Sequence, residues 1–205
     1  MSEQVELTDP VKHSIGGVYG HLFRRSFHIS MSLIPFIFFE YSEPIADYFS
    51  ITVLQVVSII TFAIVFGEGV RLKLGITIFG QRDYEAKQVS ALAWGGFAIG
   101  LTFMTLSEYP ELVWPLVLSL SLGDPFLGEL RRKGVENQNV FIWGSIFIML
   151  IWIATWYQLE TPIWLAFVMG PLCVVAEWPR LRWIDDNATM LLIPLAAIIL
   201  LVPWL

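Results

Sequence analysis

Seven apolar runs, separated by short polar connections, limit what this chain can fold into. They cover roughly 27–41, 49–68, 89–107, 109–122, 139–157, 161–178 and 188–205. A helix that crosses a bilayer needs about 20 mostly apolar residues, and backbone groups inside hydrocarbon must be paired within their own segment, which favours helices. We expect the two shorter runs, 27–41 and 109–122, to be tilted or extended by flanking residues. The sequence therefore predicts an all-α fold: a polytopic integral membrane bundle of about seven transmembrane helices, forming one domain over residues 1–205.

The basic residues all lie in alternate connections between these runs. The connections at 42–47, 107–111 and 158–162 contain no Lys or Arg. The positive-inside rule then places residues 1–26 and the basic connections in the cytoplasm and the C-terminus outside. The net charge of −6 disfavours nucleic acid as a partner. The basic residues are Lys12, Arg24, Arg25, Arg71, Lys73, Arg82, Lys87, Arg131, Arg132, Lys133, Arg180 and Arg182.

The triplet Gly123-Asp124-Pro125 ends the fourth apolar run on the side that carries the basic residues. Asp is favoured as a helix N-cap and Pro as the first helical residue, so the triplet predicts the start of a helix over 126–133. A helix N-terminus also binds phosphate, and Mg²⁺ could bridge that phosphate to Asp124. Arg131 and Lys133 in the same helix could hold a polyphosphate, or only anionic lipid headgroups.

A second acidic motif, Asp185-Asp186-Asn187-Ala188-Thr189, precedes the last apolar run. Two adjacent carboxylates at a membrane boundary repel each other and need a counter-charge such as a divalent metal. Glu177, at the end of the sixth run, adds a carboxylate from the same connection. The alternative is that Asp186 or Asn187 caps the last helix while Asp185 is solvated.

Two further groups lie on the same predicted side. Arg24, Arg25 and His28 would share one helix face and could offer three donors to an anion, although an Arg pair before a first span is also a common topology signal. Glu68 and Arg71 form an i,i+3 pair at the end of the second run, either an ordinary ion pair or a clamp for a substrate.

These motifs, in this order, resemble the polyprenol kinase family, which includes dolichol and phytol kinases. The stretch Arg24-Arg25-Ser26-Phe27-His28 is similar to the family's Arg-Lys-x-x-His opening, and Gly123-Asp124 matches its Gly-Asp. Asp185-Asp186-Asn187-Ala188-Thr189, with Pro194 beyond it, resembles the closing Asp-Asn-x-Thr-x-Pro pattern. The residues after Gly-Asp differ, because Pro125 to Glu129 stand where the family usually has Ala-Ser.

The resemblance implies a membrane enzyme that transfers the γ-phosphoryl group of CTP to the hydroxyl of a polyisoprenoid alcohol such as dolichol, phytol or geranylgeraniol, with Mg²⁺ as cofactor. Its expected partners are CTP, the alcohol and membrane lipids. Asp124, Asp185, Asp186 and His28 are the candidate catalytic residues. The candidate metal ligands are Asp124, Asp185, Asp186 and Glu177. The candidate nucleotide-binding residues are Arg24, Arg25, Gly123, Arg131, Lys133, Asn139, Asn187 and Thr189.

Two other functions fit the same sequence features. A cytidylyltransferase would use CTP and metal to make a CDP-activated lipid. A transporter or non-enzymatic scaffold would use the charged residues as a path or as a headgroup surface. Few charges fall near the middle of the runs, where transporters place their sites.

Overall fold

The computed structural model describes residues 11–179, 181 and 183–204, and these residues form helices and no β-strand, which confirms the all-α prediction. The α-helices are α1 (Gly17–Ser30), α2 (Ile34–Phe49), α3 (Val53–Leu74), α4 (Ala91–Leu106), α5 (Pro110–Arg132), α6 (Asn137–Leu159), α7 (Trp164–Glu177) and α8 (Asp186–Leu201). Three short 3-10 helices are η1 (Met31–Leu33), η2 (Asp83–Lys87) and η3 (Val202–Trp204).

The first two α-helices form one continuous helical segment. Ser30, Met31, Leu33 and Ile34 all have right-handed helical backbone angles, so the chain passes from α1 through η1 into α2 without a turn. Each predicted apolar run therefore corresponds to one helical segment in the described part of the chain. The first segment is much longer than the predicted 27–41.

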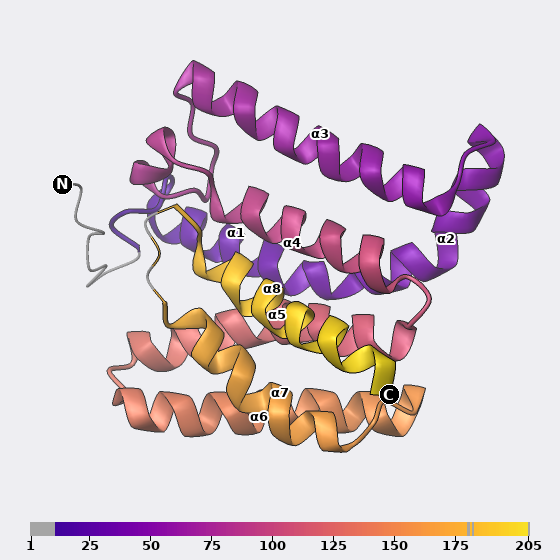
Figure 1. The fold of residues 1–205 in the computed structure, drawn as a ribbon. Helices are drawn as coiled ribbons and strands as arrows, with labels where there is room; N and C mark the ends of the chain where they lie inside the picture. Colours follow the sequence, from indigo (N-terminus) through magenta and orange to yellow (C-terminus); the bar gives the residue numbers. More distant parts are fainter. Residues whose placement is uncertain (1–10, 180, 182, 205) are drawn as a thin grey trace.

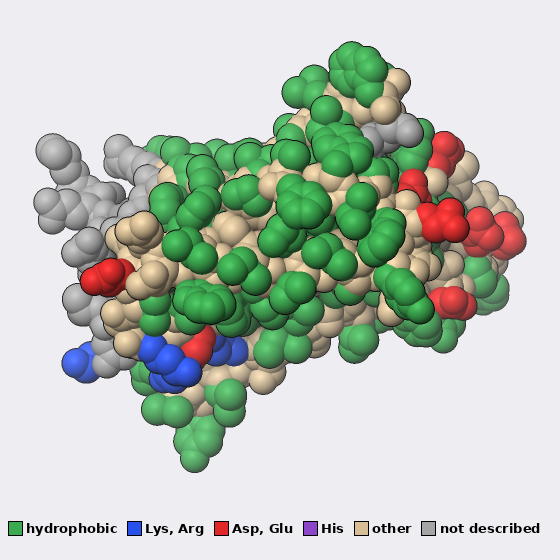
Figure 2. Space-filling model, turned by 90° about the horizontal axis from the view of Figure 1, so that it is seen from below, with side chains coloured by type: hydrophobic (Ala, Val, Ile, Leu, Met, Phe, Trp, Pro, Cys, Tyr) green, Lys and Arg blue, Asp and Glu red, His purple; other side chains and the backbone are tan. Residues whose placement is uncertain are grey.

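The helical segments lie side by side and alternate in direction (Figure 1). The connections 75–90 and 133–136, and the described residues between α7 and α8, lie at the end where α1 begins, which we call the basic end. The connections at 50–52, 107–109 and 160–163 lie at the opposite end, near the C-terminus. Figure 2 shows Lys and Arg side chains near one end, a group of acidic side chains at the other, and a largely hydrophobic surface between them.

Three helical stretches are long and apolar enough to cross a membrane: Val53–Leu74, Asn137–Leu159 and Asp186–Trp204. Ala91–Leu106 and Trp164–Glu177 are apolar but shorter. Large hydrophobic side chains are exposed along them, as on α3, where Phe62 is 69% exposed. A lipid environment accounts for this exposure better than water does, so the fold supports association with a membrane.

The predicted helix start at Gly123-Asp124-Pro125 is wrong, because α5 continues through the triplet to Arg132. The apolar stripe of α5 extends across it at helical spacing, with Leu116, Leu120 and Leu127 fully buried. That stripe outweighs the one backbone hydrogen bond that an interior proline removes. Gly123 is buried on the same face, where an added Cβ would lie 2.7 Å from Met190 Cε of α8. The glycine thus allows α5 and α8 to approach closely.

The core surrounds α5, which packs against α1, α2, α4, α6 and α8. The fully buried Trp152 of α6 donates a hydrogen bond from its indole N–H to Ser119 Oγ of α5 at 3.1 Å. By contrast, α3 packs mainly against α2 and α4 and lies at the edge of the bundle (Figure 1). A capping box between Thr52 and Gln55 fixes where α3 begins.

Candidate functional site

The Arg24–His28 motif of α1 contacts the Gly123-Asp124-Pro125 motif of α5 at the basic end. Arg25 Nη1 donates to the carbonyl oxygen of Pro125 at 2.8 Å. His28 Nδ1 lies 3.4 Å from Asp124 Oδ2. Two motifs about a hundred residues apart in the sequence therefore form one cluster, as expected if both serve one site.

His28 is the most enclosed member of this cluster. Its side chain is 7% exposed, and its Nδ1 has no hydrogen-bond partner of good geometry among the described residues. A buried, unpaired ring nitrogen is costly unless it has a use. A cavity of about 180 Å³ opens beside His28 and Arg24. Its other lining residues are Phe23, Phe27, Met31, Ile78, Phe79, Gly80, Gln81, Ala91 and Leu92.

The third motif forms the N-terminus of α8. Asp185 is the N-cap, and its Oδ1 accepts hydrogen bonds from the backbone N–H of Asn187 at 3.1 Å and from Asn187 Nδ2 at 2.7 Å. The alternative in which Asp186 or Asn187 is the cap is therefore wrong. Thr189 Oγ1 donates to the carbonyl of Asp186 at 3.1 Å. Asn187 Oδ1 is buried and has no partner among the described residues.

Asp185 and Asp186 form an acidic pair at the start of α8. Burial and the neighbouring Asp186 raise the pKa of Asp185 well above its usual value, although Arg24 and the amide of Asn187 act in the opposite direction. A cation bound at this pair would offset the cost of ionising Asp185.

The connection between α3 and α4 contributes Arg82, which was not among the predicted site residues. Arg82 donates from Nη1 to Tyr84 Oη at 2.6 Å. Burial alone would lower the pKa of Arg82, but Tyr84, Asp186 and Asp185 stabilise the cation and raise it. Arg82 is therefore a counter-charge for the acidic pair. The sequence offered one signal for Arg82, its position in a connection at the basic end.

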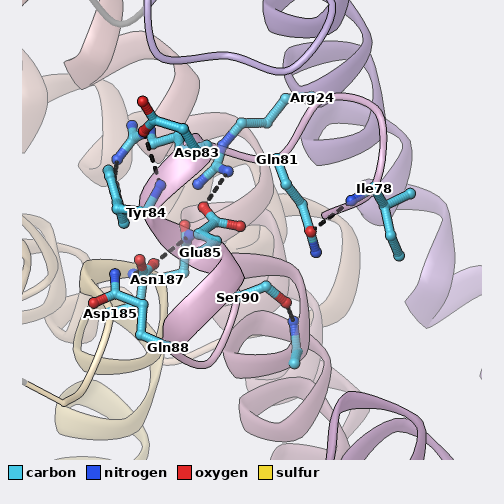
Figure 3. Close-up of polar contacts among 12 residues, drawn as sticks. Arg24, Ile78, Gln81, Asp83, Tyr84, Glu85, Gln88, Ser90, Asp185 and Asn187 are labelled. Atoms are coloured by element: carbon cyan, nitrogen blue, oxygen red, sulfur yellow. Dashed lines mark hydrogen bonds and ion pairs between the residues drawn. The ribbon is translucent and has the colours of Figure 1, made fainter. Parts of the chain in front are cut away.

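The same connection joins α1 to the site (Figure 3). Arg24 Nη1 forms an ion pair with Glu85 Oε1 at 2.8 Å, and Glu85 is only 1% exposed. In Figure 3, η2 lies between Arg24 on one side and Asp185 and Asn187 on the other. Arg24, Arg25 and His28 are thus brought to one place, but both arginines already have protein partners.

Two other predicted residues, Arg131 and Glu177, form an ion pair with each other, and both interact electrostatically with Asp124 and Asp186. Arg131 Nη2 lies 2.7 Å from Glu177 Oε2, and a second contact makes the pair bidentate, so Glu177 is poorly placed as a metal ligand. Lys133 and Asn139 are exposed, at the end of α5 and in the first turn of α6. Arg180, in the connection before α8, lies outside the described residues, as does Arg182.

The predicted ion pair between Glu68 and Arg71 is present, with an Nη2–Oε1 distance of 2.7 Å. Glu68 Oε1 also accepts from the backbone N–H of Ser90 at 2.6 Å. Arg71 donates to the carbonyls of Ile76 and Gln88 at 2.7 and 2.8 Å. The pair therefore ties the 75–90 connection to the end of α3.

A preformed set of three His, Cys, Asp or Glu side chains able to hold a metal ion does not occur among the described residues. Mg²⁺ in nucleotide enzymes is typically held by one or two carboxylates, with phosphate and water completing the shell. Asp185 and Asp186, adjacent at the start of α8, fit that pattern. Asp124 faces His28 instead.

Asp185→Asn should stabilise the protein while it impairs the site. Asn is an equally good N-cap and keeps the acceptor oxygen for Asn187. Because the folded-state pKa of Asp185 is raised, its carboxyl destabilises the fold increasingly as pH rises above the usual Asp value near about 3.9. We expect the apparent Tm in detergent to rise by at least about 2 °C at pH 8 and by less at pH 5. A lower Tm at pH 8 would contradict the raised pKa of Asp185.

Comparison with known proteins adds no assignment: no protein-family model matches the chain, and no curated protein or solved structure matches it.

Proposed function

We propose that the protein is a membrane-embedded lipid-alcohol kinase that transfers the γ-phosphoryl group of CTP to the hydroxyl of a polyisoprenoid alcohol. The observation that supports this most is the convergence of the three motifs at the basic end. Arg25 and His28 of α1 contact the Pro125 carbonyl and Asp124 of α5. Arg24 and Arg82 interact electrostatically with the carboxylates at the start of α8.

Phosphoryl transfer requires mainly alignment and neutralisation of charge. Bound Mg²⁺, held by Asp185 and Asp186, would neutralise the phosphates. Arg24, Arg25 and Arg82 provide the positive field around them. His28 lines the adjoining cavity with one ring nitrogen facing Asp124, so its other nitrogen is the candidate to accept the proton of the alcohol.

Labelled CTP distinguishes this proposal from the other functions. Purified protein would receive α-labelled or γ-labelled CTP with Mg²⁺ and either geranylgeraniol, phytol, dolichol or phosphatidic acid. We expect label only from the γ position, and only on the alcohols. Label from the α position on phosphatidic acid would replace the kinase with a cytidylyltransferase. No transfer by folded protein would favour a transporter or scaffold.

The proposed topology places the basic end in the cytoplasm, with seven crossings and the C-terminus outside. In a Cys173→Ala background, cysteines introduced at the exposed positions Glu43, Glu108 and Gln158 should react with an impermeant thiol reagent on intact cells. A cysteine at the exposed Gln138 should react only after the membrane is opened. Labelling at both ends from one side would contradict this topology.

CTP should be preferred over ATP by at least about tenfold in kcat/KM, equivalent to about 1.4 kcal/mol. The sequence has no P-loop of the Gly-x-x-x-x-Gly-Lys-Ser/Thr type, and the family resemblance implies CTP. Discrimination would come from hydrogen bonds to the edge of the base, which leave protein groups unpaired when the wrong base binds. Both nucleotides would compete in one reaction, with phosphorylated lipid as the readout. Equal use of ATP would contradict the donor assignment but not the kinase assignment.

A further inference from the structure

A second and larger cavity lies between α2, α3 and α4. Its volume is about 660 Å³, within the range of about 300–1,000 Å³ that is typical of small-molecule sites. Most of its lining is aliphatic or aromatic, including the stacked rings of Phe38 and Phe103, whose centroids are 4.1 Å apart. We call this cavity the apolar groove.

The apolar groove is long and follows one face of α3. Its α3 wall includes Val56, Ile60, Ala63, Gly67 and Arg71, which recur at helical spacing. Fifteen residues separate Val56 from Arg71, which corresponds to about 22 Å along the helix axis. That length covers most of a hydrocarbon core of about 30 Å. The opposite face of α3 carries exposed apolar side chains such as Phe62 and Phe66, as expected beside lipid.

The groove carries charged side chains at one end only. Glu68, Arg71, Gln81 and Ser90 line it at the basic end. Among the described residues, the other polar side chains of the lining are two hydroxyls, Thr61 on the α3 wall and Ser42 at the far end. An amphiphile with one long chain and a polar head matches this distribution.

The groove and the cavity beside His28 share part of their lining. The shared residues are Phe27, Met31, Ile78, Gln81 and Leu92. A chain in the groove would therefore extend to His28 and Arg24 without leaving an apolar surface. The smaller cavity has only Arg24, His28 and Gln81 as polar side chains, which suits a small uncharged hydroxyl better than a phosphate-bearing headgroup with two chains.

We propose that the apolar groove holds the hydrocarbon chain of the lipid alcohol, with its hydroxyl beside His28, and that the length of the groove sets the longest chain that it accommodates. This inference rests on the proposed kinase function. It identifies the acceptor as a single-chain alcohol. It also assigns α3 as the wall along which the hydrocarbon chain lies, so that the length of this wall limits the length of the chain.

Two glycines of α3 provide a matched pair of test positions. Gly67 lines the groove, and an added Cβ there would have no atom within 4 Å. Gly69 has the same open surroundings but is not a groove residue. Phe at either position replaces a poor helix former with a better one. Gly67→Phe would block the groove near its polar end, and Gly69→Phe would leave it open.

Photo-crosslinking without nucleotide tests the location of the chain. The probe is geranylgeraniol with a diazirine at the end of its tail, added to protein in nanodiscs, and the labelled peptides are identified by mass spectrometry. We expect labelling of residues that line the groove on α2, α3 and α4. Gly67→Phe should reduce it at least tenfold, and Gly69→Phe should leave it within twofold of wild type. Equal labelling of both variants, or labelling confined to other helices, would overturn the proposal.

A second variant tests the measurement of length. Ala63 lies eight residues from Arg71, or about 12 Å along α3. Ala63→Phe should reduce labelling by the geranylgeraniol probe at least fivefold and leave labelling by a matching geraniol probe unchanged. Equal effects of Ala63→Phe on both probes would show that the groove does not limit chain length.

The two proposals can fail separately. Labelling of the groove without phosphoryl transfer would support the groove as a lipid site and contradict the kinase function. Phosphoryl transfer with labelling outside the groove would support the kinase function and contradict the groove.

Discussion

Asp186→Asn should reduce phosphoryl transfer from CTP by about 10³-fold, equivalent to about 4 kcal/mol of transition-state stabilisation. Asn preserves the size of the side chain but removes half of the acidic pair that begins α8. The hydrogen bond from Thr189 goes to the backbone carbonyl of residue 186, so the helix start should survive. Activity would be measured at saturating CTP over a range of Mg²⁺ concentrations, since a lost ligand should also raise the Mg²⁺ requirement.

Asp83→Asn is the control for this prediction. Asp83 belongs to the same end of the molecule, but its side chain is 58% exposed and faces His13 rather than the acidic pair. We expect Asp83→Asn to retain activity within twofold of wild type. If Asp186→Asn retained full activity with an unchanged Mg²⁺ requirement, the role of the acidic pair as metal ligands would be wrong.

His28→Gln should reduce kcat by at least about 10²-fold, the usual contribution of a general base. The variant should keep its affinity for CTP, because the substitution leaves Arg24, Arg25 and Arg82, the proposed phosphate-binding arginines, in place. Wild-type kcat should fall as the pH is lowered, since a protonated imidazole cannot accept the proton of the alcohol. His28→Gln should lose this acidic limb, which a purely structural histidine would not control. His13→Gln is the matched control and should behave as wild type, because the partly exposed His13 ring pairs with Asp83 and not with the three motifs.

Asp124→Asn tests whether Asp124 acts through His28. The two side chains are in contact, so a double variant should lose little more activity than the more severe single variant. Additive losses would show that Asp124 and His28 act separately, for example with Asp124 on metal.

The helical architecture was largely predictable, because each apolar run contains no Lys or Arg and at most one Asp or Glu, and a helix is the form that pairs all of its backbone groups in hydrocarbon. The boundaries of the helices were harder to predict than their existence. The N-cap signal of Asp124 and Pro125 predicted a break in α5, but burial of Leu116, Leu120 and Leu127 along one stripe kept the helix continuous. Local capping preferences are worth about 1 kcal/mol, and burial of several leucines is worth more.

The candidate site was predictable in part. The motifs of α1, α5 and α8 were expected on one side, and Arg25 and His28 do contact Pro125 and Asp124. The partners that depend on tertiary packing were not predictable from spacing. Arg82 beside the acidic pair and the apolar groove along α3 belong to this class, because they arise from segments that approach each other only in the folded bundle.

If the three motifs at the basic end form one phosphoryl-transfer site, purified protein in nanodiscs with Mg²⁺ should transfer the γ-label of CTP to geranylgeraniol. The transfer would be compared among wild type, Asp186→Asn, His28→Gln and Asp83→Asn. We expect labelled geranylgeranyl phosphate from wild type and Asp83→Asn, and at most about 1% of that rate from the other two. Equal transfer by all four proteins would contradict the claim, as would no transfer from folded wild type to this or any other polyisoprenoid alcohol.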